Sequence, residues 1–198
     1  MSLKTAIRHA DHVGLTVPDL DQAVSFFVDV FGGTERARFA VRDNPEIMEH
    51  GLGVHPQASL SAVLLQLTPA LCVELFQYQA PGQDTRMPEV SDIGGHHLCI
   101  VVDDLDAALA ELRSRPDVRA GNPGRVSYGP HAGGRWLYFR TSWGLVIELI
   151  ADPPARRSRW CGALLGDRVA AVHDQVLPGD VGRAGAGQPG DGGGDLVG

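Results

Sequence analysis

Lysine is almost absent from this sequence, in which Lys4 is the only one among 198 residues. With arginine included, 17 basic residues stand against 24 acidic ones, and the formal net charge is -7. No cluster of basic residues forms a stripe that could neutralise a phosphate backbone. The composition therefore argues against nucleic acid as a partner.

Cysteine and long apolar runs are also scarce. The three cysteines, Cys72, Cys99 and Cys161, are widely spaced and form no C-x-x-C pair, which argues against a disulfide framework and a thiolate metal site. No run approaches the ~18 apolar residues of a membrane span, and the N-terminal residues lack the pattern of a signal peptide. We expect a cytoplasmic protein that does not bind membranes.

The composition of the sequence changes near residue 151, where segments with alternating apolar residues are followed by a stretch rich in glycine and proline. Such a segment buries too little apolar surface to offset the entropy of ordering the chain. We expect residues 152–198 to form a disordered tail, within which residues 163–177 have the pattern of a short helix.

The sequence contains an internal repeat. The stretch ADHVGLTVPDLDQAV at residues 10–24 returns as GGHHLCIVVDDLDAAL at residues 94–109. Aligning His12 with His97 also superposes Asp19 on Asp104. Each copy begins with an apolar strand, continues with an aspartate suited to cap a helix, and ends in apolar residues at helical spacing.

Each copy is followed by a pair of apolar strands around a short turn, LSAVLLQLTPALCVELFQY and RWLYFRTSWGLVIELI. Further strands are expected at residues 37–41 and within 118–128. The sequence therefore predicts an α+β fold of two tandem βαβββ modules. Their boundaries are residues 9–80 and 94–151, with a linker at 81–93.

A single glutamate interrupts each second hairpin strand, as Glu74 in LCVEL and Glu148 in LVIEL. A buried carboxylate is costly unless it is paired or binds a metal. Because side chains alternate along a strand, both glutamates face away from the helices, as do His12 and His97. His97 is therefore the counterpart of His12, and His96 takes the place of Asp11.

The four groups converge by symmetry, and imidazole with carboxylate suits a divalent ion such as Ni, Co, Fe(II), Mn or Zn. A lone histidine at a strand end, or a lone glutamate on an open sheet, is more often only polar surface. The correspondence of all four positions under the repeat favours a metal site made by His12, Glu74, His97 and Glu148.

At these residues the sequence resembles the vicinal oxygen chelate superfamily, which includes glyoxalase I, methylmalonyl-CoA epimerase, extradiol dioxygenases and the bleomycin and fosfomycin resistance proteins. The resemblance rests on the segments DHVGLTVPDLDQAVSFFVDVFGG, CVELF, GGHHLCIVVDDLDAALAEL and YFRTSWGLVIELI. The resemblance implies a U-shaped half-barrel around one divalent metal ion, a homodimer, and a substrate whose adjacent oxygens chelate the metal.

The ligand set narrows the function that the resemblance implies. With Glu74 as a fourth ligand, the site resembles the four-ligand sites of glyoxalase I and the epimerases. No arginine follows His12, which argues against glutathione conjugates, and scarce lysine argues against coenzyme A. We expect a metal-dependent isomerase, epimerase or lyase acting on a small α-hydroxy-carbonyl substrate through a metal-stabilised enediolate and proton transfer. The alternatives are an Fe(II)-dependent extradiol-type dioxygenase and a metal-free, antibiotic-binding resistance protein.

Further residues are expected to act on the substrate. Glu148 is the expected catalytic base, and Glu46 and Glu49 from the loop at 42–58 could serve the opposite face.

His131, Arg135 and Tyr138, from the glycine-rich segment at 127–139, are expected to contact the substrate. Alternation leaves open whether Trp136 and Tyr138 or their neighbours line the cup.

Overall fold

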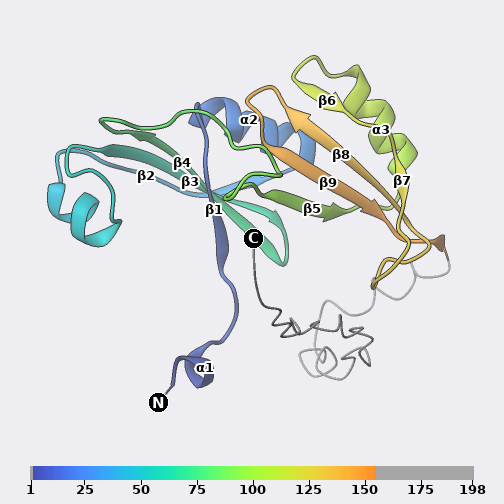
Figure 1. Cartoon of the computed structure of the whole chain (residues 1–198), viewed down its shortest axis with the longest axis horizontal. Coiled ribbons are helices and arrows are strands. Elements are labelled where there is room, and N and C mark those ends of the chain that lie inside the picture. Colours follow the sequence, from blue (N-terminus) through green and yellow to red (C-terminus); the bar gives the residue numbers. More distant parts are fainter. Residues whose placement is uncertain (1, 155–198) are drawn as a thin grey trace, which may run out of the picture. The chain divides into compact units, whose positions relative to one another are not determined.

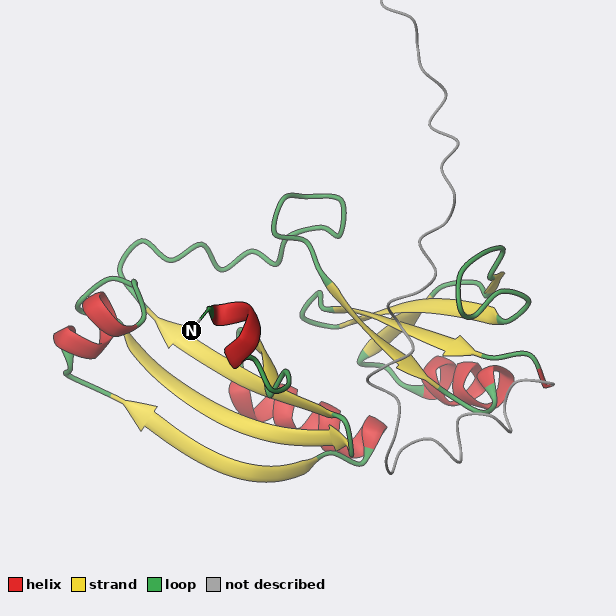
Figure 2. Ribbon diagram, turned by 90° about the horizontal axis from the view of Figure 1, so that it is seen from below, coloured by secondary structure: helices red, strands yellow, loops and turns green. Residues whose placement is uncertain are grey.

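Two β-sheets, each with a helix against one face, make up the computed structural model, which describes residues 2–154 (Figures 1 and 2). The first half contains α1 (Leu3–Ala6), β1 (His12–Thr16), α2 (Leu20–Phe31), β2 (Thr34–Val41), the π-helical turn η1 (Ile47–Gly51), β3 (Ser59–Thr68) and β4 (Leu71–Gln79). The second half contains β5 (His97–Val101), α3 (Leu105–Ser114), β6 (Val118–Ala120), β7 (Gly124–Arg125), β8 (Arg135–Thr141) and β9 (Val146–Ala151).

The two sheets share one topology. The first has the order β1-β4-β3-β2 and the second the order β5-β9-β8-β6, with β7 paired to β8. In each sheet the first strand runs parallel to the last, and the other pairs are antiparallel. The predicted α+β class and repeated βαβββ pattern are confirmed.

Both main helices begin where the sequence predicts. The Asp19 carboxylate accepts a hydrogen bond from the Gln22 amide, and Asp104 accepts bonds from the Asp106 and Ala107 amides. These bonds satisfy amides of the first turn that have no partner within the helix. Helix α2 ends at Phe31 and is capped by Gly32, whose left-handed φ of 66° suits glycine.

The buried core lies between each helix and its sheet. Helix α2 contributes Ala23, Phe26 and Phe27, and strands β3 and β4 oppose it with alternate apolar side chains that include Val63, Leu65, Val73 and Leu75. Helix α3 packs on β8 and β9 through Leu109 and Leu112. Because alternate residues face the helices, the intervening residues of the same strands lie on the opposite face.

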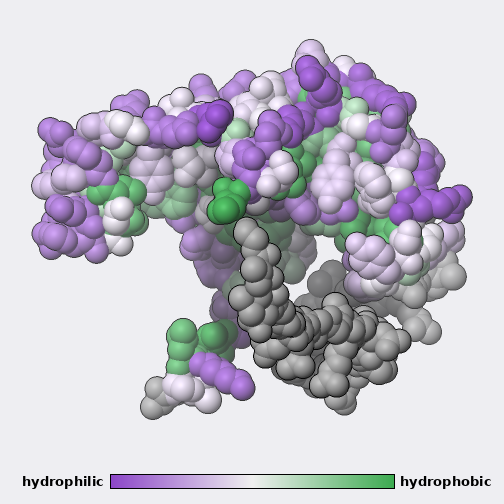
Figure 3. All heavy atoms as spheres, in the orientation of Figure 1, coloured by the Kyte–Doolittle hydropathy of each residue, from purple (hydrophilic) through white to green (hydrophobic). Residues whose placement is uncertain are grey.

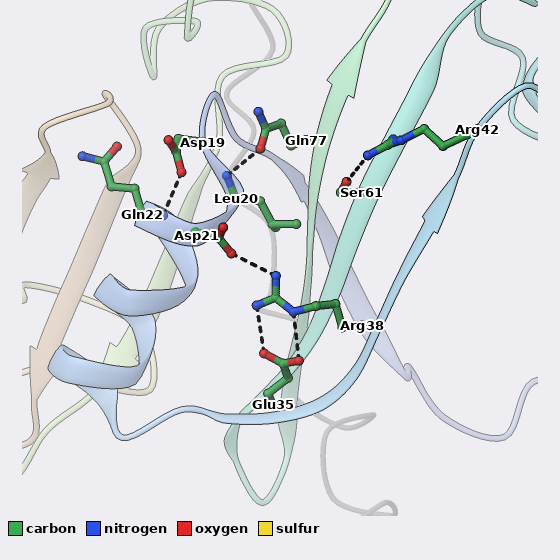
Figure 4. A network of polar contacts seen from close by, with 9 residues as sticks. All are labelled: Asp19, Leu20, Asp21, Gln22, Glu35, Arg38, Arg42, Ser61 and Gln77. Atoms are coloured by element: carbon green, nitrogen blue, oxygen red, sulfur yellow. Dashed lines mark hydrogen bonds and ion pairs between the residues drawn. The ribbon is translucent and has the colours of Figure 1, made fainter.

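Charged side chains tie α2 to the edge of the first sheet (Figure 4). The Arg38 guanidinium on β2 donates to both carboxylate oxygens of Glu35 at 3.1 and 3.0 Å, and to Asp21 of α2 at 2.9 Å. Gln77 of β4 accepts a bond from the Leu20 amide at 3.0 Å. These contacts fix the start of α2 on the sheet.

Beyond the sheets, apolar groups remain exposed near the N-terminus. Leu3 and Ile7 are 80% and 66% exposed, and hydrophobic groups are visible on this segment in Figure 3. Within residues 2–154 no helix could span a membrane. The expected helix at 163–177, and nearly all of the expected disordered tail, lie outside the described residues.

Candidate metal and proton-transfer site

A histidine and a glutamate meet on the helix-free face of the first sheet. Parallel pairing of β1 with β4 places His12 opposite Cys72 and Gly14 opposite Glu74. The His12 Nε2 atom lies 3.1 Å from Glu74 Oε2. Its other ring nitrogen, Nδ1, lies 2.8 Å from Asp11 Oδ2, so the ring is held from both sides.

The second sheet repeats this arrangement in the same register. His97 lies opposite Val146, and Cys99 lies opposite Glu148. The His97 Nε2 atom is 3.2 Å from Glu148 Oε2. The preceding His96 instead donates from its ring Nδ1 to the Gly94 carbonyl at 3.1 Å. The structure thus places His97, rather than His96, beside the glutamate.

Burial and neighbouring carboxylates shift the pKa values of three groups around these pairs. A hydrogen bond to Asp11, aided by the charge of Glu74, raises the pKa of His12 against a smaller opposing effect of burial. Burial, with a hydrogen bond to Glu148, raises the pKa of Tyr138 to about 12. Burial and the neighbouring Glu148 likewise raise the pKa of Cys99 to about 12. Both groups therefore stay protonated beside Glu148 at neutral pH.

The donor chemistry of the two pairs fits a divalent metal ion. Each pair offers one imidazole nitrogen and one carboxylate. The bond that His12 Nδ1 donates to Asp11 orients the ring, as outer carboxylates orient ligating histidines in metal sites. Within residues 2–154 of a single chain, no group of three or more His, Cys, Asp or Glu side chains lies close enough to hold a metal. Each sheet therefore carries half of the expected ligand set.

A pocket of about 470 Å³ opens beside Glu148. Its lining includes Tyr128, His131, Trp136, Tyr138, Glu148 and Ile150. The Tyr138 ring meets the His97 ring edge-on, with the two centroids 5.4 Å apart. Because Leu137 and Phe139 are buried in the core, the alternate residues Trp136 and Tyr138 face the pocket.

The pocket is lined by a histidine, His131, that is paired with an acid. His131 Nδ1 lies 2.8 Å from Asp152 Oδ1, and the Asp152 side chain is only 5% exposed. The sequence predicts His131 at the substrate but places Asp152 in the tail. An acid two residues beyond the apolar Ile150, on the same strand face, was the signal that could have identified it.

Other expected site residues lie elsewhere. Arg135 donates to Asp106 of α3 at 2.7 Å and does not line the pocket beside Glu148. Its position has the same parity as the buried Leu137, which explains why its side chain turns toward the helix. Glu46 and Glu49 are exposed at η1, and the described contacts do not join either of them to Glu74 or Glu148.

The turn that carries these acids is nevertheless anchored on the functional face. Met48 of η1 is fully buried against Leu60 and Ala62, with Phe76 and Tyr78 packed beside them. Phe76 and Tyr78 follow Glu74 at alternate positions of β4, so all three share one face. The expected loop at 42–58 therefore packs on the face of the first sheet that carries Glu74.

Comparison with known proteins identifies the family of the chain. The model of the Glyoxalase/Bleomycin resistance protein/Dioxygenase superfamily matches residues 11–128. A 2-epi-5-epi-valiolone epimerase from an Actinomyces species is 48% identical over 144 residues, which cover 72% of this chain and 78% of that protein. The mitochondrial methylmalonyl-CoA epimerase of Mus musculus is 30% identical over 143 residues, with 70% of each chain covered.

A solved structure has the same fold. The glyoxalase family protein from Bacillus cereus superposes with a TM-score of 0.59 at 23% sequence identity, and the match covers 76% of this chain and 98% of that one.

Proposed function

Because the chain belongs to the Glyoxalase/Bleomycin resistance protein/Dioxygenase superfamily, we propose that it is a divalent-metal-dependent epimerase of a small α-hydroxy ketone. The preferred substrate class is a polyhydroxylated cyclic ketone such as 2-epi-5-epi-valiolone. The similarity to an epimerase named for that compound, at 48% identity, supports this choice. The observation that carries the proposal is the Glu148 carboxylate, which lies 3.2 Å from His97 and lines a pocket.

His12, Glu74, His97 and Glu148 would hold the metal ion. When bound, such an ion acts as a Lewis acid on adjacent carbonyl and hydroxyl oxygens, which makes the neighbouring C–H bond acidic. Once the substrate oxygens take its place as a ligand, the Glu148 carboxylate would be free to take the proton from that carbon. Tyr138, which stays protonated beside Glu148, lines the space that the substrate fills.

The metal site is proposed to form between two copies of the chain. Since each sheet carries one histidine and one glutamate, the His12 and Glu74 pair of one subunit would be completed by the partner's His97 and the partner's Glu148. A homodimer built in this way holds two equivalent sites. Dilution below the dimer dissociation constant should therefore release metal and abolish activity together.

The test uses the purified full chain with a measured metal content. Incubation with 2-epi-5-epi-valiolone in deuterated water should give the epimer with deuterium at the inverted carbon, as followed by NMR. Chelation should stop the reaction, and Ni, Co or Mn should restore it without dioxygen.

The alternatives predict other products. Oxygen uptake with a ring-cleaved catechol product, strictly dependent on Fe(II), would support a dioxygenase. Tight antibiotic binding by the metal-free protein, with no proton exchange, would support a resistance protein.

A further inference from the structure

We propose that His131, held by the buried Asp152, is the second proton-transfer group of this site and serves the substrate face opposite Glu148. This inference rests on the proposed epimerase function. Inversion at a carbon requires that a proton leave one face and that another arrive on the opposite face. Sequence reasoning sought the second group in Glu46 and Glu49, whereas the described pocket beside Glu148 contains His131.

The His131 ring is oriented for proton exchange. Its Nδ1 atom lies 2.8 Å from Asp152 Oδ1, and a carboxylate there accepts the Nδ1 proton. The bond leaves Nε2 as the ring nitrogen that can take or give a proton. An aspartate in this position also stabilises the imidazolium form and fixes the tautomer, as in the acid-histidine pairs of hydrolases.

The backbone around His131 supports this orientation. The Val126 amide donates to the Gly134 carbonyl, and the Gly133 amide donates to the Val126 carbonyl, both at 2.9 Å. The Gly134 amide donates to the His131 carbonyl at 2.9 Å. These bonds close the base of the loop at residues 126–134, so that His131 is presented from a defined turn.

Glu148 and His131 border the same pocket of about 470 Å³, which is large enough for a small cyclic substrate. Asp152 has the same parity as Glu148 and Ile150 on the strand that ends at Ala151. Strand β9 thus carries the base Glu148, and Asp152, directly after the strand, positions His131. The His131 side chain is 24% exposed, which leaves it accessible to a ligand.

The proposed step balances as follows. Glu148 takes the proton as the C–H bond breaks, and the electron pair moves through the carbonyl to give the substrate enolate. The His131 imidazolium donates its Nε2 proton to the same carbon from the other face, and the returning electron pair forms the new C–H bond. Glu148 ends protonated and His131 ends neutral, and proton exchange with water restores both. The reverse reaction exchanges their roles.

The same pair could instead serve only as a tether between the loop and the end of β9. A buried carboxylate needs a partner, and His131 provides one. A structural tether would affect both epimers of the substrate equally. A proton-transfer group would affect one epimer selectively, because each epimer presents its proton to one group only.

The experiment measures deuterium uptake from deuterated water into 2-epi-5-epi-valiolone and, separately, into its epimer, using the full-length metal-loaded protein. Wild type should exchange both. His131→Gln should lower epimerisation by about 10²-fold or more. It should keep exchange in the epimer whose proton faces Glu148 and lose exchange in the other. Metal content and thermal midpoint should match wild type.

Asp152→Asn tests the positioning role. It should give the same one-sided loss of exchange with a lower kcat and a nearly unchanged KM. His50→Gln is the matched control, because His50 is exposed and its partner Glu46 lies 4.0 Å away. If Asp152→Asn fails to fold, His131→Gln alone decides, because the His131 side chain is partly exposed.

Equal exchange of both epimers in His131→Gln, whether retained or lost, overturns the inference while leaving the epimerase function intact. A wild-type protein that exchanges neither epimer overturns the proposed function and this inference with it.

Discussion

His97 Nε2 lies 3.2 Å from Glu148 Oε2, whereas His96 bonds to the backbone carbonyl of Gly94. The two neighbouring histidines therefore differ in what their removal should do. His97→Ala should abolish stoichiometric metal binding, and His96→Ala should leave it nearly intact, as measured by elemental analysis of the purified proteins. The opposite order would show that the repeat alignment is wrong by one residue.

Gly124 should be intolerant of a side chain. A Cβ atom there would come within 2.3 Å of the Trp136 ring, which donates a hydrogen bond to the Arg125 carbonyl. Gly124→Ala should displace the indole and cost about 1–3 kcal/mol of unfolding free energy, measured by denaturant titration. Gly51→Ala is the control, because its nearest contact would be an ordinary 3.8 Å. Equal stability of the two variants would contradict this packing.

Arg115 should contribute to stability in a pH-dependent way. It makes two hydrogen bonds to Asp117, at 2.9 and 2.7 Å, and its guanidinium lies 5.9 Å from the centre of the Phe26 ring. The Arg115 hydrogen bonds lower the pKa of Asp117. Because the folded-state pKa of Asp117 is lowered, its ionised carboxylate stabilises the fold at pH values above the ordinary carboxyl pKa. This stabilisation is lost as the pH falls through the folded-state pKa.

Arg115→Met should therefore cost about 1 kcal/mol at neutral pH. The difference from wild type should shrink as the pH falls below ~4. Thermal unfolding across this pH range provides the measurement, with the exposed Arg113→Met as control. A difference that grows toward acid would contradict the role assigned to Asp117.

Residues beyond Arg157 should be dispensable for folding. The described cores are built from residues up to Ala151, and Asp152 is the last buried side chain assigned a role. A chain ending after Arg157 should keep a cooperative thermal transition and its full metal content. Loss of that transition would show that the removed residues belong to the core.

Local rules were sufficient for much of the architecture. Helix starts followed from Asp19 and Asp104, because a capping carboxylate acts on amides only a few residues away. The placement of His97 followed from strand alternation across the repeat. Alternation alone could not decide between Tyr138 and Phe139, since the choice depends on which side of β8 the helix covers.

Two details depend on tertiary structure. Arg135, which the sequence predicts at the substrate, hydrogen-bonds to Asp106 at the start of α3 because its strand position faces the helix. The change in composition near residue 151 predicts that Asp152 belongs to the tail, whereas the structure buries it beside His131, which lies 21 residues earlier in the sequence.

The equal register of the two sheets bears on how such a chain could have arisen. A half-length ancestor with one histidine and one glutamate would build the same four-group site by self-association, but with twofold symmetry. Symmetry would present identical chemistry to both sides of a chiral molecule. Among residues 2–154 of the fused chain, η1 is found only in the first half and the His131 loop only in the second. A duplicated chain can therefore carry the His131 loop in one half without repeating it in the other, so that the two sides of a pocket need not be alike.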